Sequence, residues 1–483
     1  MSSSLKQQTI SGIIWSAFQK FGTLGISFVS NIILARLLSP DDYGCIGLLA
    51  IFIVIAEVFV NGGFASALIQ KKNPSQKDYS TVFIWNIFVS LILYFILYLI
   101  APYVALYYQI PLLVSVLRVQ GIIIFINALS IIQLSVLRKQ LQFKKLSIIQ
   151  LIAAIVSVFF AIVMAFQGWG IWSLVMQQLL YGLITTIALW FTANWKPILC
   201  FSFKSFKELF GYGAFLLMSD LLNSIYENIQ GLLIGKKYTS IDMGYYTQAR
   251  KLETVPTQSI SYVVSQVTFP VFAKLQNDKQ QLYVAVRKSL RMMNYLNFPL
   301  MILLIVIAEP LFILLFSDKW ISSVPYFRIL CLSGIVNCLQ SVNYQVVCAV
   351  GRSKEVFKWN IIKRLIGFIF IFIGLYWGIS GLLYGMVCGF YFTFIVNALV
   401  ATPTTGYTIY QQLKDVFPIL SISIFSAVLP YLMINCSGLN NFILLLLQIV
   451  IYGIIFLFLS KITSRIELLE YEKIIKSYMK REK

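Results

Sequence analysis

An apolar stretch at residues 10–34 carries polar side chains at helical spacing. These are Ser16, Lys20, Thr23, Ser27 and Asn31. At 100° per residue they fall within roughly 80° of arc, so they form one narrow polar stripe on an otherwise apolar helix. An ammonium, hydroxyls and an amide in one row can contact an anionic, hydroxyl-rich ligand.

A second stripe, of opposite charge, lies in the apolar stretch 208–234. It consists of Asp220, Asn223, Glu227 and Gln230. A shift of 200 positions places Lys20 on Asp220. Both charges lie about ten residues into their stretches, or ~15 Å deep at 1.5 Å per residue. A charge at such depth costs ~2.5–3.5 kcal/mol on insertion scales, so we expect both stripes to face an internal cleft.

Two further groups of charges also lie within apolar stretches. Glu57 lies near the middle of the stretch 44–68, and Arg250, Lys251 and Glu253 lie in the stretch 244–272. Two interpretations stay open. The charges can form a structural ion-pair lattice, for example between Lys20 and Asp220 or Glu227. Alternatively they line a hydrated cavity, with cations for an anionic substrate and carboxylates for sugar hydroxyls or a coupling cation.

The composition indicates which elements must hold these side chains. The 483 residues are 59% hydrophobic with a mean hydropathy of +0.83, which is typical of an all-α polytopic membrane protein. We predict fourteen spans and interpret the N-terminal segment as the first of them rather than a cleavable signal. Their expected bounds are 10–34, 44–68, 81–107, 115–136, 147–167, 170–193, 208–234, 244–272, 292–316, 323–348, 359–376, 380–401, 415–434 and 440–461.

The basic residues predict the orientation of these spans. With the N-terminus in the cytoplasm, 29 of the 38 Lys and Arg fall in cytoplasmic segments and four on the opposite side. Both termini are therefore predicted to be cytoplasmic. The net charge of +20 is then a topology signal and a contact with anionic lipid, and a nucleic-acid partner is not needed to explain it.

Residue types that would support other chemistry are few. There is no His, and no C-x-x-C pair occurs among the seven Cys. We therefore predict no metal site, no cofactor and no catalytic residue, and no ATP-binding P-loop is found. Proton or Na⁺ coupling remains open.

An internal repeat organises the chain. Residues 42–44 match 242–244, residues 117–127 match 327–337 and residues 169–171 match 377–379. The repeat predicts two parallel six-helix lobes, 1–200 and 201–402, related by a pseudo-two-fold axis along the membrane normal. Two extra helices (403–461) and a basic amphipathic cytoplasmic tail (462–483) follow.

The repeat also sorts the remaining charges. Asp41 and Asp42 are expected in a turn, with Asp42 or its neighbour capping the next helix rather than binding substrate. Arg118 and Arg328 pair in the repeat at external helix ends, where snorkelling to head groups explains them more cheaply than ligand binding. The rim charges are expected to be Arg36, Lys236 and Lys237.

Several segments resemble a known family along essentially the whole chain. They are residues 9–52, 62–72, 79–87, 172–179, 205–213, 234–260 and 309–320. These resemble the Wzx-type, colanic-acid-exporter-like flippases of the multidrug/oligosaccharidyl-lipid/polysaccharide exporter superfamily. The resemblance implies two lobes around a V-shaped cavity. It also implies alternating-access translocation of an undecaprenyl-diphosphate-linked oligosaccharide across the bacterial inner membrane, for O-antigen, capsule or exopolysaccharide synthesis.

The resemblance also implies roles for individual residues. Lys20, Arg250 and Lys251 stand where the family presents cations to the lipid diphosphate. Asn31, Asn223, Gln230, Ser27 and Glu227 would meet sugar hydroxyls, with Ser16 and Thr23 beside them. Asp220, Glu227 or Glu57 would couple an ion, and Glu57 departs from the family's basic pattern in the second helix. Expected partners are membrane lipids, a polysaccharide polymerase and chain-length machinery.

Two other functions are alternatives for this sequence. A cation-coupled drug exporter of the same superfamily would share the fold but favour an aromatic, acidic cavity in one lobe. A membrane polymerase, ligase or O-acyltransferase would usually need a large external loop or a catalytic His, which this sequence does not contain.

Overall fold

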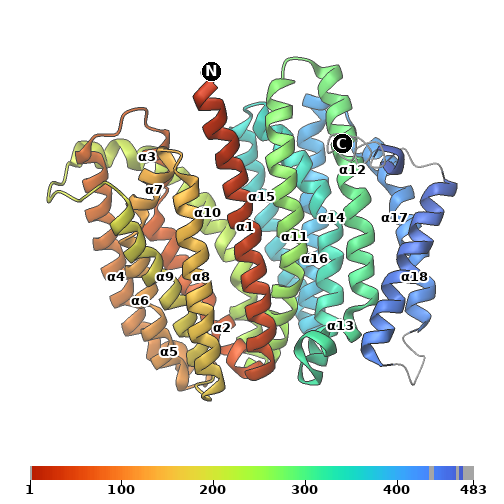
Figure 1. Ribbon diagram of the computed structural model, residues 1–483, viewed down its shortest axis with the longest axis horizontal. Coiled ribbons are helices and arrows are strands. Elements are labelled where there is room, and N and C mark those ends of the chain that lie inside the picture. The colour runs from red at the N-terminus through yellow and green to blue at the C-terminus, as the bar shows by residue number, and fades with distance from the viewer. Residues whose placement is uncertain (1–2, 434–439, 464–466, 471–483) are drawn as a thin grey trace. The chain divides into compact units, whose positions relative to one another are not determined.

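The computed structural model describes residues 3–433, 440–463 and 467–470. All regular elements in these ranges are helices, and ten stretches are long and apolar enough to cross a membrane. The predicted all-helical membrane class is therefore confirmed (Figure 1). The count of fourteen spans stays a prediction.

The chain divides into two compact units, residues 1–247 and 248–483. The helices that begin in the first unit are α1 (Ser3–Leu37), α2 (Pro40–Asn61), α3 (Phe64–Gln70), α4 (Gln76–Tyr108), α5 (Leu112–Gln120), α6 (Ile122–Ala128), α7 (Ile131–Lys139), α8 (Phe143–Phe166), α9 (Ile171–Thr192), α10 (Phe203–Lys237) and α11 (Ser240–Lys274). The boundary between the units lies within α11. Helix α10 belongs to the first unit because it packs along α2 and against α3 and α4. The two lobes inferred from the repeat stay a prediction.

The second unit contains the rest of α11 and the elements that follow. These are α12 (Lys279–Val306), α13 (Ala308–Phe316), η1 (Asp318–Ser323), α14 (Val324–Ala349), α15 (Ser353–Gly374), η2 (Leu375–Trp377), α16 (Gly378–Thr405), α17 (Ile409–Leu432) and α18 (Asn441–Ile462). An apolar core joins α12, α14, α16 and α17 and includes residues of α11 and α18. Of the predicted tail, residues 467–470 are helical, and residues 464–466 and 471–483 lie outside the described ranges.

Three predicted spans are interrupted. Within the span 44–68, α2 ends before Gly62 and α3 begins after Gly63. Both residues have a positive φ (50° and 70°), a conformation that favours glycine. The span 115–136 consists of α5, α6 and α7. The span 292–316 breaks at Ile307, because Pro310 has no N–H to continue the helical ladder to Val306.

The repeat is visible in the first turns of α2 and α11. Ser39 caps α2, and the carboxylate of Asp42 accepts from the Ser39 amide (2.9 Å) and hydroxyl (2.7 Å). At a shift of 200, Asp242 accepts from the Thr239 amide (3.1 Å) and hydroxyl (2.7 Å). The cap of α2 is therefore Ser39, three residues before Asp42, and not Asp42 or its neighbour as predicted. Asp42 lies in the first turn of α2 and completes the capping box.

The same two helix starts cross at a pair of equivalent glycines. A Cβ added to Gly44 would overlap the carbonyl oxygen of Ser240, and one added to Gly244 would overlap that of Pro40. Since Pro40 and Ser240 also correspond at a shift of 200, the contact is symmetric in the repeat. Its closeness requires glycine on both sides.

Ion pairs and aromatic packing stabilise one end of the first unit. Lys71 lies 3.1 Å from a carboxylate oxygen of both Asp78 and Glu208. Burial acts to lower the pKa of the Lys71 ammonium, but hydrogen bonds to Glu208 and Asp78 outweigh it and hold that pKa above its ordinary value. The apolar cluster around Phe64 and Trp195 packs beside them, so α3, α4 and α10 are held together here.

Candidate functional site

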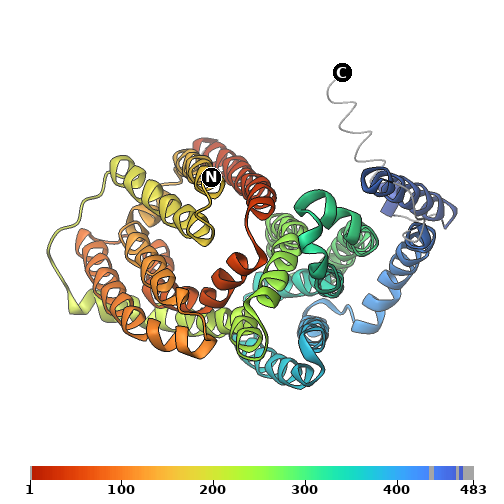
Figure 2. The ribbon, with the colours of Figure 1, turned by 90° about the horizontal axis from the view of Figure 1, so that it is seen from below.

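Helix α1 packs against α8, and the two lie side by side in Figures 1 and 2. Gly12 and Gly22 allow this contact, since a Cβ on either would lie 2.7 Å from a side-chain atom of α8. Between them, the hydroxyl of Ser147 donates to the Trp15 carbonyl (2.9 Å). At 100° per residue, the predicted polar stripe lies roughly a quarter turn around α1 from the row of residues that contacts α8. The stripe therefore does not face α8.

The stripe of α1 is partly accessible along its length. Ser16, Lys20, Thr23 and Asn31 are half-buried and Ser27 is exposed. The Thr23 hydroxyl bonds back to the carbonyls of Gln19 (2.8 Å) and Lys20 (3.1 Å). The oxygen of the Asn31 amide is buried and accepts no hydrogen bond from the described residues. Half-buried polar groups of this kind can contact a ligand without leaving the helix surface.

The stripe of α10 is more uneven. Asp220 and Glu227 are exposed and Asn223 is half-buried, but Gln230 is only 1% exposed. Gln230 donates to the carbonyl of Tyr226 (3.3 Å). It precedes Gly231, whose missing Cβ would lie 3.0 Å from the Gly47 carbonyl of α2. Gln230 therefore lies near the packed contact with α2, and the pairing of Lys20 with Asp220 or Glu227 stays a prediction.

Glu57 lies in a polar cavity inside the first unit. The cavity has a volume of about 230 Å³. Ser130 and five apolar side chains form part of the lining, and the polar wall includes Glu57, Asn61, Asn127, Gln150, Tyr181 and Thr185. These residues come from α2, α6, α8 and α9, so four separate helices supply the oxygen and nitrogen atoms.

The contacts of the cavity wall suit a small cation. The amide nitrogen of Asn127 donates to Glu57 Oε1 at 2.7 Å. Thr185 Oγ1 is buried and has no hydrogen-bond partner among the described residues. No group of three or more Cys, Asp or Glu side chains in the described ranges could hold a metal ion. One carboxylate with neutral oxygens around it can bind a proton or an alkali ion, and such a group inside a membrane span marks a functional position.

The second unit holds an acid that is already neutralised. Glu253 is 2% exposed, and its carboxylate lies 3.1 Å from Arg250 Nη1. The hydroxyl of Thr257 donates to its other oxygen at 2.6 Å. Lys251, the next residue of the predicted diphosphate set, is exposed. Arg250 is therefore engaged with Glu253 in this structure.

The rim candidates have structural contacts of their own. Arg118 donates to the Tyr98 carbonyl (3.3 Å) and lies over the Tyr98 ring, and its repeat partner Arg328 donates to the Ile305 carbonyl (3.2 Å). Lys236 lies 4.3 Å from the centre of the Tyr107 ring. Arg36 and Lys237 are exposed.

The prediction from sequence missed most of the cavity around Glu57. Asn127 carried a signal, because it aligns with Asn337 in the repeat. Gln150, Tyr181 and Thr185 carried none, since neutral polar residues in apolar stretches are common and only the fold brings these three together.

Residues 33–325 match a protein family described as polysaccharide biosynthesis protein. Among the curated relatives, the teichuronic acid biosynthesis protein TuaB of Bacillus subtilis is 28% identical over 74% of both chains. The lipopolysaccharide biosynthesis protein WzxC of Escherichia coli is 23% identical over 89% of this chain and 88% of its own. The succinoglycan biosynthesis transport protein ExoT of Rhizobium meliloti is 26% identical over 73% and 71%.

The fold is shared with solved transporters. The lipid II flippase MurJ, in an inward closed conformation, superposes with a TM-score of 0.77 at 17% identity, over 94% of this chain and 99% of its own. An inward-facing multidrug resistance transporter of the MATE family gives 0.62 at 16% identity, over 82% and 98%. The fold expected from the resemblance is thereby confirmed, and the chain is a multi-pass membrane protein that shares the fold of these transporters.

Proposed function

We propose, since the chain belongs to the family of polysaccharide biosynthesis proteins, that it is a flippase for a lipid-linked oligosaccharide. The carrier would be undecaprenyl diphosphate, and the glycan would be a repeat unit of a surface polysaccharide. The relatives support this, because they are described as polysaccharide biosynthesis and transport proteins. The observation that carries the proposal is the accessible stripe of α1, which presents one cation, Lys20, among neutral hydrogen-bonding groups.

Each part of the substrate has a candidate partner. Lys20 would hold the diphosphate through charge-assisted contacts. Arg250 and Lys251 have the same chemistry in the second unit, although Arg250 must first exchange its contact with Glu253. Sugar hydroxyls would meet Ser27, Asn31, Asn223 and Glu227, whereas Gln230, which is 1% exposed, is not accessible to such a ligand in this structure. The lipid tail would stay in the bilayer while the protein alternates access between the two membrane faces.

The proposed setting is the bacterial inner membrane with both termini in the cytoplasm. The distribution of Lys and Arg supports this orientation, because 29 of 38 fall on the side of the termini. A polysaccharide polymerase and chain-length machinery would receive the flipped repeat unit. We propose no enzymatic step in this chain.

We further propose that ion coupling, by a proton or Na⁺, uses Glu57. Of the three predicted carboxylates, Asp220 and Glu227 are exposed, whereas Glu57 is half-buried in a partly open cavity and is bonded to Asn127. A carboxylate in such a cavity can exchange one bound cation per cycle.

Replacement of the stripe cation tests the flippase proposal. In a host that depends on this chain for its surface polysaccharide, Lys20→Ala should lower export roughly 10- to 100-fold, because a hydrogen bond to a charged group contributes ~1.5–3 kcal/mol. Lipid-linked repeat units should accumulate on the inner leaflet, and protein levels should be unchanged. Lys20→Arg should retain export, and Lys72→Ala, at an exposed lysine, is the matched control.

Full polysaccharide production by Lys20→Ala would remove this residue from the mechanism. The MATE-like fold also permits a drug exporter. A deletion strain with altered drug susceptibility and unchanged polysaccharide would favour that alternative.

A further inference from the structure

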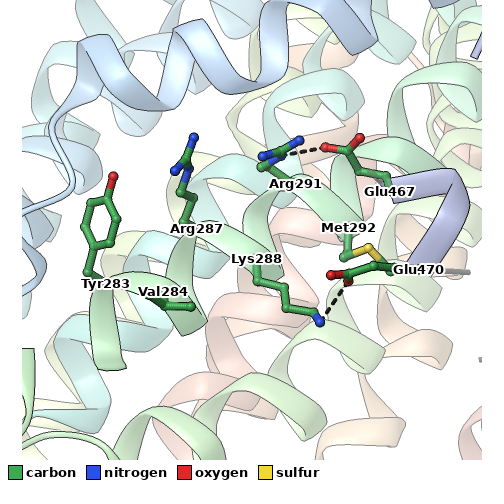
Figure 3. A pocket seen from close by; sticks show the side chains of 8 residues that line it. All are labelled: Tyr283, Val284, Arg287, Lys288, Arg291, Met292, Glu467 and Glu470. Atoms are coloured by element: carbon green, nitrogen blue, oxygen red, sulfur yellow. Dashed lines mark hydrogen bonds and ion pairs between the residues drawn. The ribbon is translucent and has the colours of Figure 1, made fainter. Parts of the chain in front are cut away.

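A second pocket lies on the second unit, at the start of α12 (Figure 3). Its volume is about 210 Å³. One wall is a single face of α12, formed by Tyr283, Val284, Arg287, Lys288, Arg291 and Met292. The other wall is formed by Glu467 and Glu470 from the tail. Nothing in the proposed transport cycle uses these residues.

Three cationic side chains of α12 line the pocket, and each uses only some of its N–H donors within the protein. Arg287 makes two hydrogen bonds to Asp415 (2.6 and 2.8 Å), Arg291 makes one to Glu467 (2.5 Å), and Lys288 lies 2.8 Å from Glu470. An arginine has five N–H donors and a lysine has three. Each side chain therefore retains donors for a further acceptor, and Arg287 and Lys288 keep 42% and 59% of their side chains exposed.

The opposite wall presents an oxygen that needs a donor. Glu467 is 2% exposed, and its Oε1 accepts from Arg291. Its Oε2 is buried without a hydrogen-bond partner among the described residues. A buried carboxylate oxygen in this state is costly, so the site favours a ligand that brings an N–H group. The pocket is therefore complementary to a ligand with one anionic and one cationic end.

The position of the pocket indicates the source of such a ligand. Residues 283–291 directly precede the expected span 292–316, so they lie at the depth where a membrane-spanning helix meets the lipid head groups. Val284 is 57% exposed and lies on the same face as the cations, which provides an apolar contact beside them. A zwitterionic membrane phospholipid supplies a head-group cation, a phosphate and an apolar body, in this order along the molecule.

We propose that this pocket binds the head group of a phospholipid that carries a primary ammonium, of the phosphoethanolamine type. The phosphate lies against Arg287 and Lys288, and the ammonium donates to Glu467 Oε2 and to Glu470. A trimethylated ammonium has no N–H to donate, and a purely anionic head group would meet the two carboxylates with repulsion. The pocket therefore selects by head group, and the bound lipid fastens the tail to α12.

Lipid-dependent stabilisation of the purified full-length protein tests this. The thermal-unfolding midpoint is measured in detergent against phosphatidylethanolamine, phosphatidylcholine and phosphatidylglycerol with identical acyl chains. A ligand that binds only the folded state raises the midpoint with the logarithm of its concentration. We expect phosphatidylethanolamine to reach the same shift at a concentration at least tenfold lower than either of the other lipids.

Two variants locate the effect. Glu467→Gln should abolish the preference for ethanolamine over choline, whereas Glu355→Gln, which alters an ion pair elsewhere in the same unit, should keep it. Each preference is a comparison of lipids within one variant, so a general loss of stability cancels. Lys288→Gln should weaken both zwitterionic lipids, with Lys279→Gln at the same helix start as its control. Equal shifts for the three lipids, a stronger shift with phosphatidylglycerol, or a preference that survives in Glu467→Gln would each overturn the proposal.

Discussion

The two units place an asparagine at corresponding positions and give it different partners. In the first unit, Asn127 donates to the carboxylate of Glu57 at 2.7 Å. In the second, its repeat partner Asn337 donates to the Thr257 carbonyl (3.4 Å) and the Ser261 hydroxyl (2.6 Å). Thr257 is also the residue that corresponds to Glu57 at a shift of 200. The duplicated scaffold therefore carries an ionisable group at this position in only one of its copies.

The second unit has its acid one helical turn earlier, and that acid is neutralised. Glu253 is paired with Arg250 and accepts from Thr257. By contrast, none of the ion pairs in the described ranges includes Glu57. An acid with a fixed cation stabilises the structure, whereas an acid with neutral partners can change its bound cation. The comparison favours a structural role for Glu253 and supports the coupling role that we propose for Glu57.

The parts that the two copies of the repeat share are structural. The N-terminal caps of α2 and α11, the glycine crossing and the contacts of Arg118 and Arg328 to a preceding helix all recur. Changes to shared parts should therefore act on folding in both copies, and a change at Glu57 should act on transport alone.

The glycine crossing should give the largest effect. Gly44→Ala or Gly244→Ala places a methyl group on a backbone carbonyl of the facing helix, and backbone cannot move aside as a flexible side chain can. We expect each variant to lose most of its folded protein, measured by fluorescence-detected gel filtration of detergent extracts. Because the contact is symmetric, the two variants should lose similar amounts.

The matched control is Gly25→Ala in α1, where an added Cβ has no neighbour within 4 Å. This variant should fold as well as the wild type, since alanine favours a helix by ~1 kcal/mol over glycine. Normal yields of Gly44→Ala would show that the crossing is looser than the structure has it.

Substitution of Glu57 should affect transport, whereas substitution of Glu253 should affect stability. Glu57→Gln keeps the shape and can still bond Asn127, so we expect near-normal yield and a loss of proton- or Na⁺-driven transport of roughly tenfold or more. Glu253→Gln removes one partner of a buried ion pair, so it should lower the free energy of unfolding by ~3–5 kcal/mol. The measurements are pH- and Na⁺-dependent transport in proteoliposomes and thermal unfolding of the same preparations.

The pH or Na⁺ dependence of transport should disappear in Glu57→Gln and persist in whatever Glu253→Gln protein folds. If the dependence follows Glu253 instead, the two roles are exchanged. If it follows neither, coupling lies at Asp220 or Glu227, the remaining predicted carboxylates.

The class of fold and the register of the repeat could be predicted because both depend on local residue types. Apolar stretches indicate spans wherever they occur, and the turn at 42–44 is recognisable in its copy at 242–244. The breaks at Gly62 and Ile307 were missed, although Asn61-Gly62-Gly63 and Glu309-Pro310 mark them, because hydropathy averaged over a span does not register such short signals. Hydropathy reports the solvent around a segment and not the course of its backbone.

The candidate site was less predictable than the fold. Lys363 was one of the 29 basic residues used for orientation, but it is 6% exposed and donates to Asn397 at 2.7 Å. Gln150, Tyr181 and Thr185 come from two helices that the sequence stripes did not include. A charge is visible in a sequence, but whether it meets water, lipid or an amide depends on which helix packs beside it.

The smallest effect tests the shared scaffold most directly. Ser39→Ala and Thr239→Ala each remove the hydroxyl that accepts from the helix amide and donates to Asp42 or Asp242. Loss of an N-cap side chain costs ~1 kcal/mol, so each variant should lower the thermal-unfolding midpoint by a few degrees. Because the two caps have the same geometry, the two shifts should agree, and Ser39→Thr and Thr239→Ser should restore the wild-type value. A marked loss of stability at one cap with none at the other would show that the two helix starts, despite their matching contacts, do not support the fold equally.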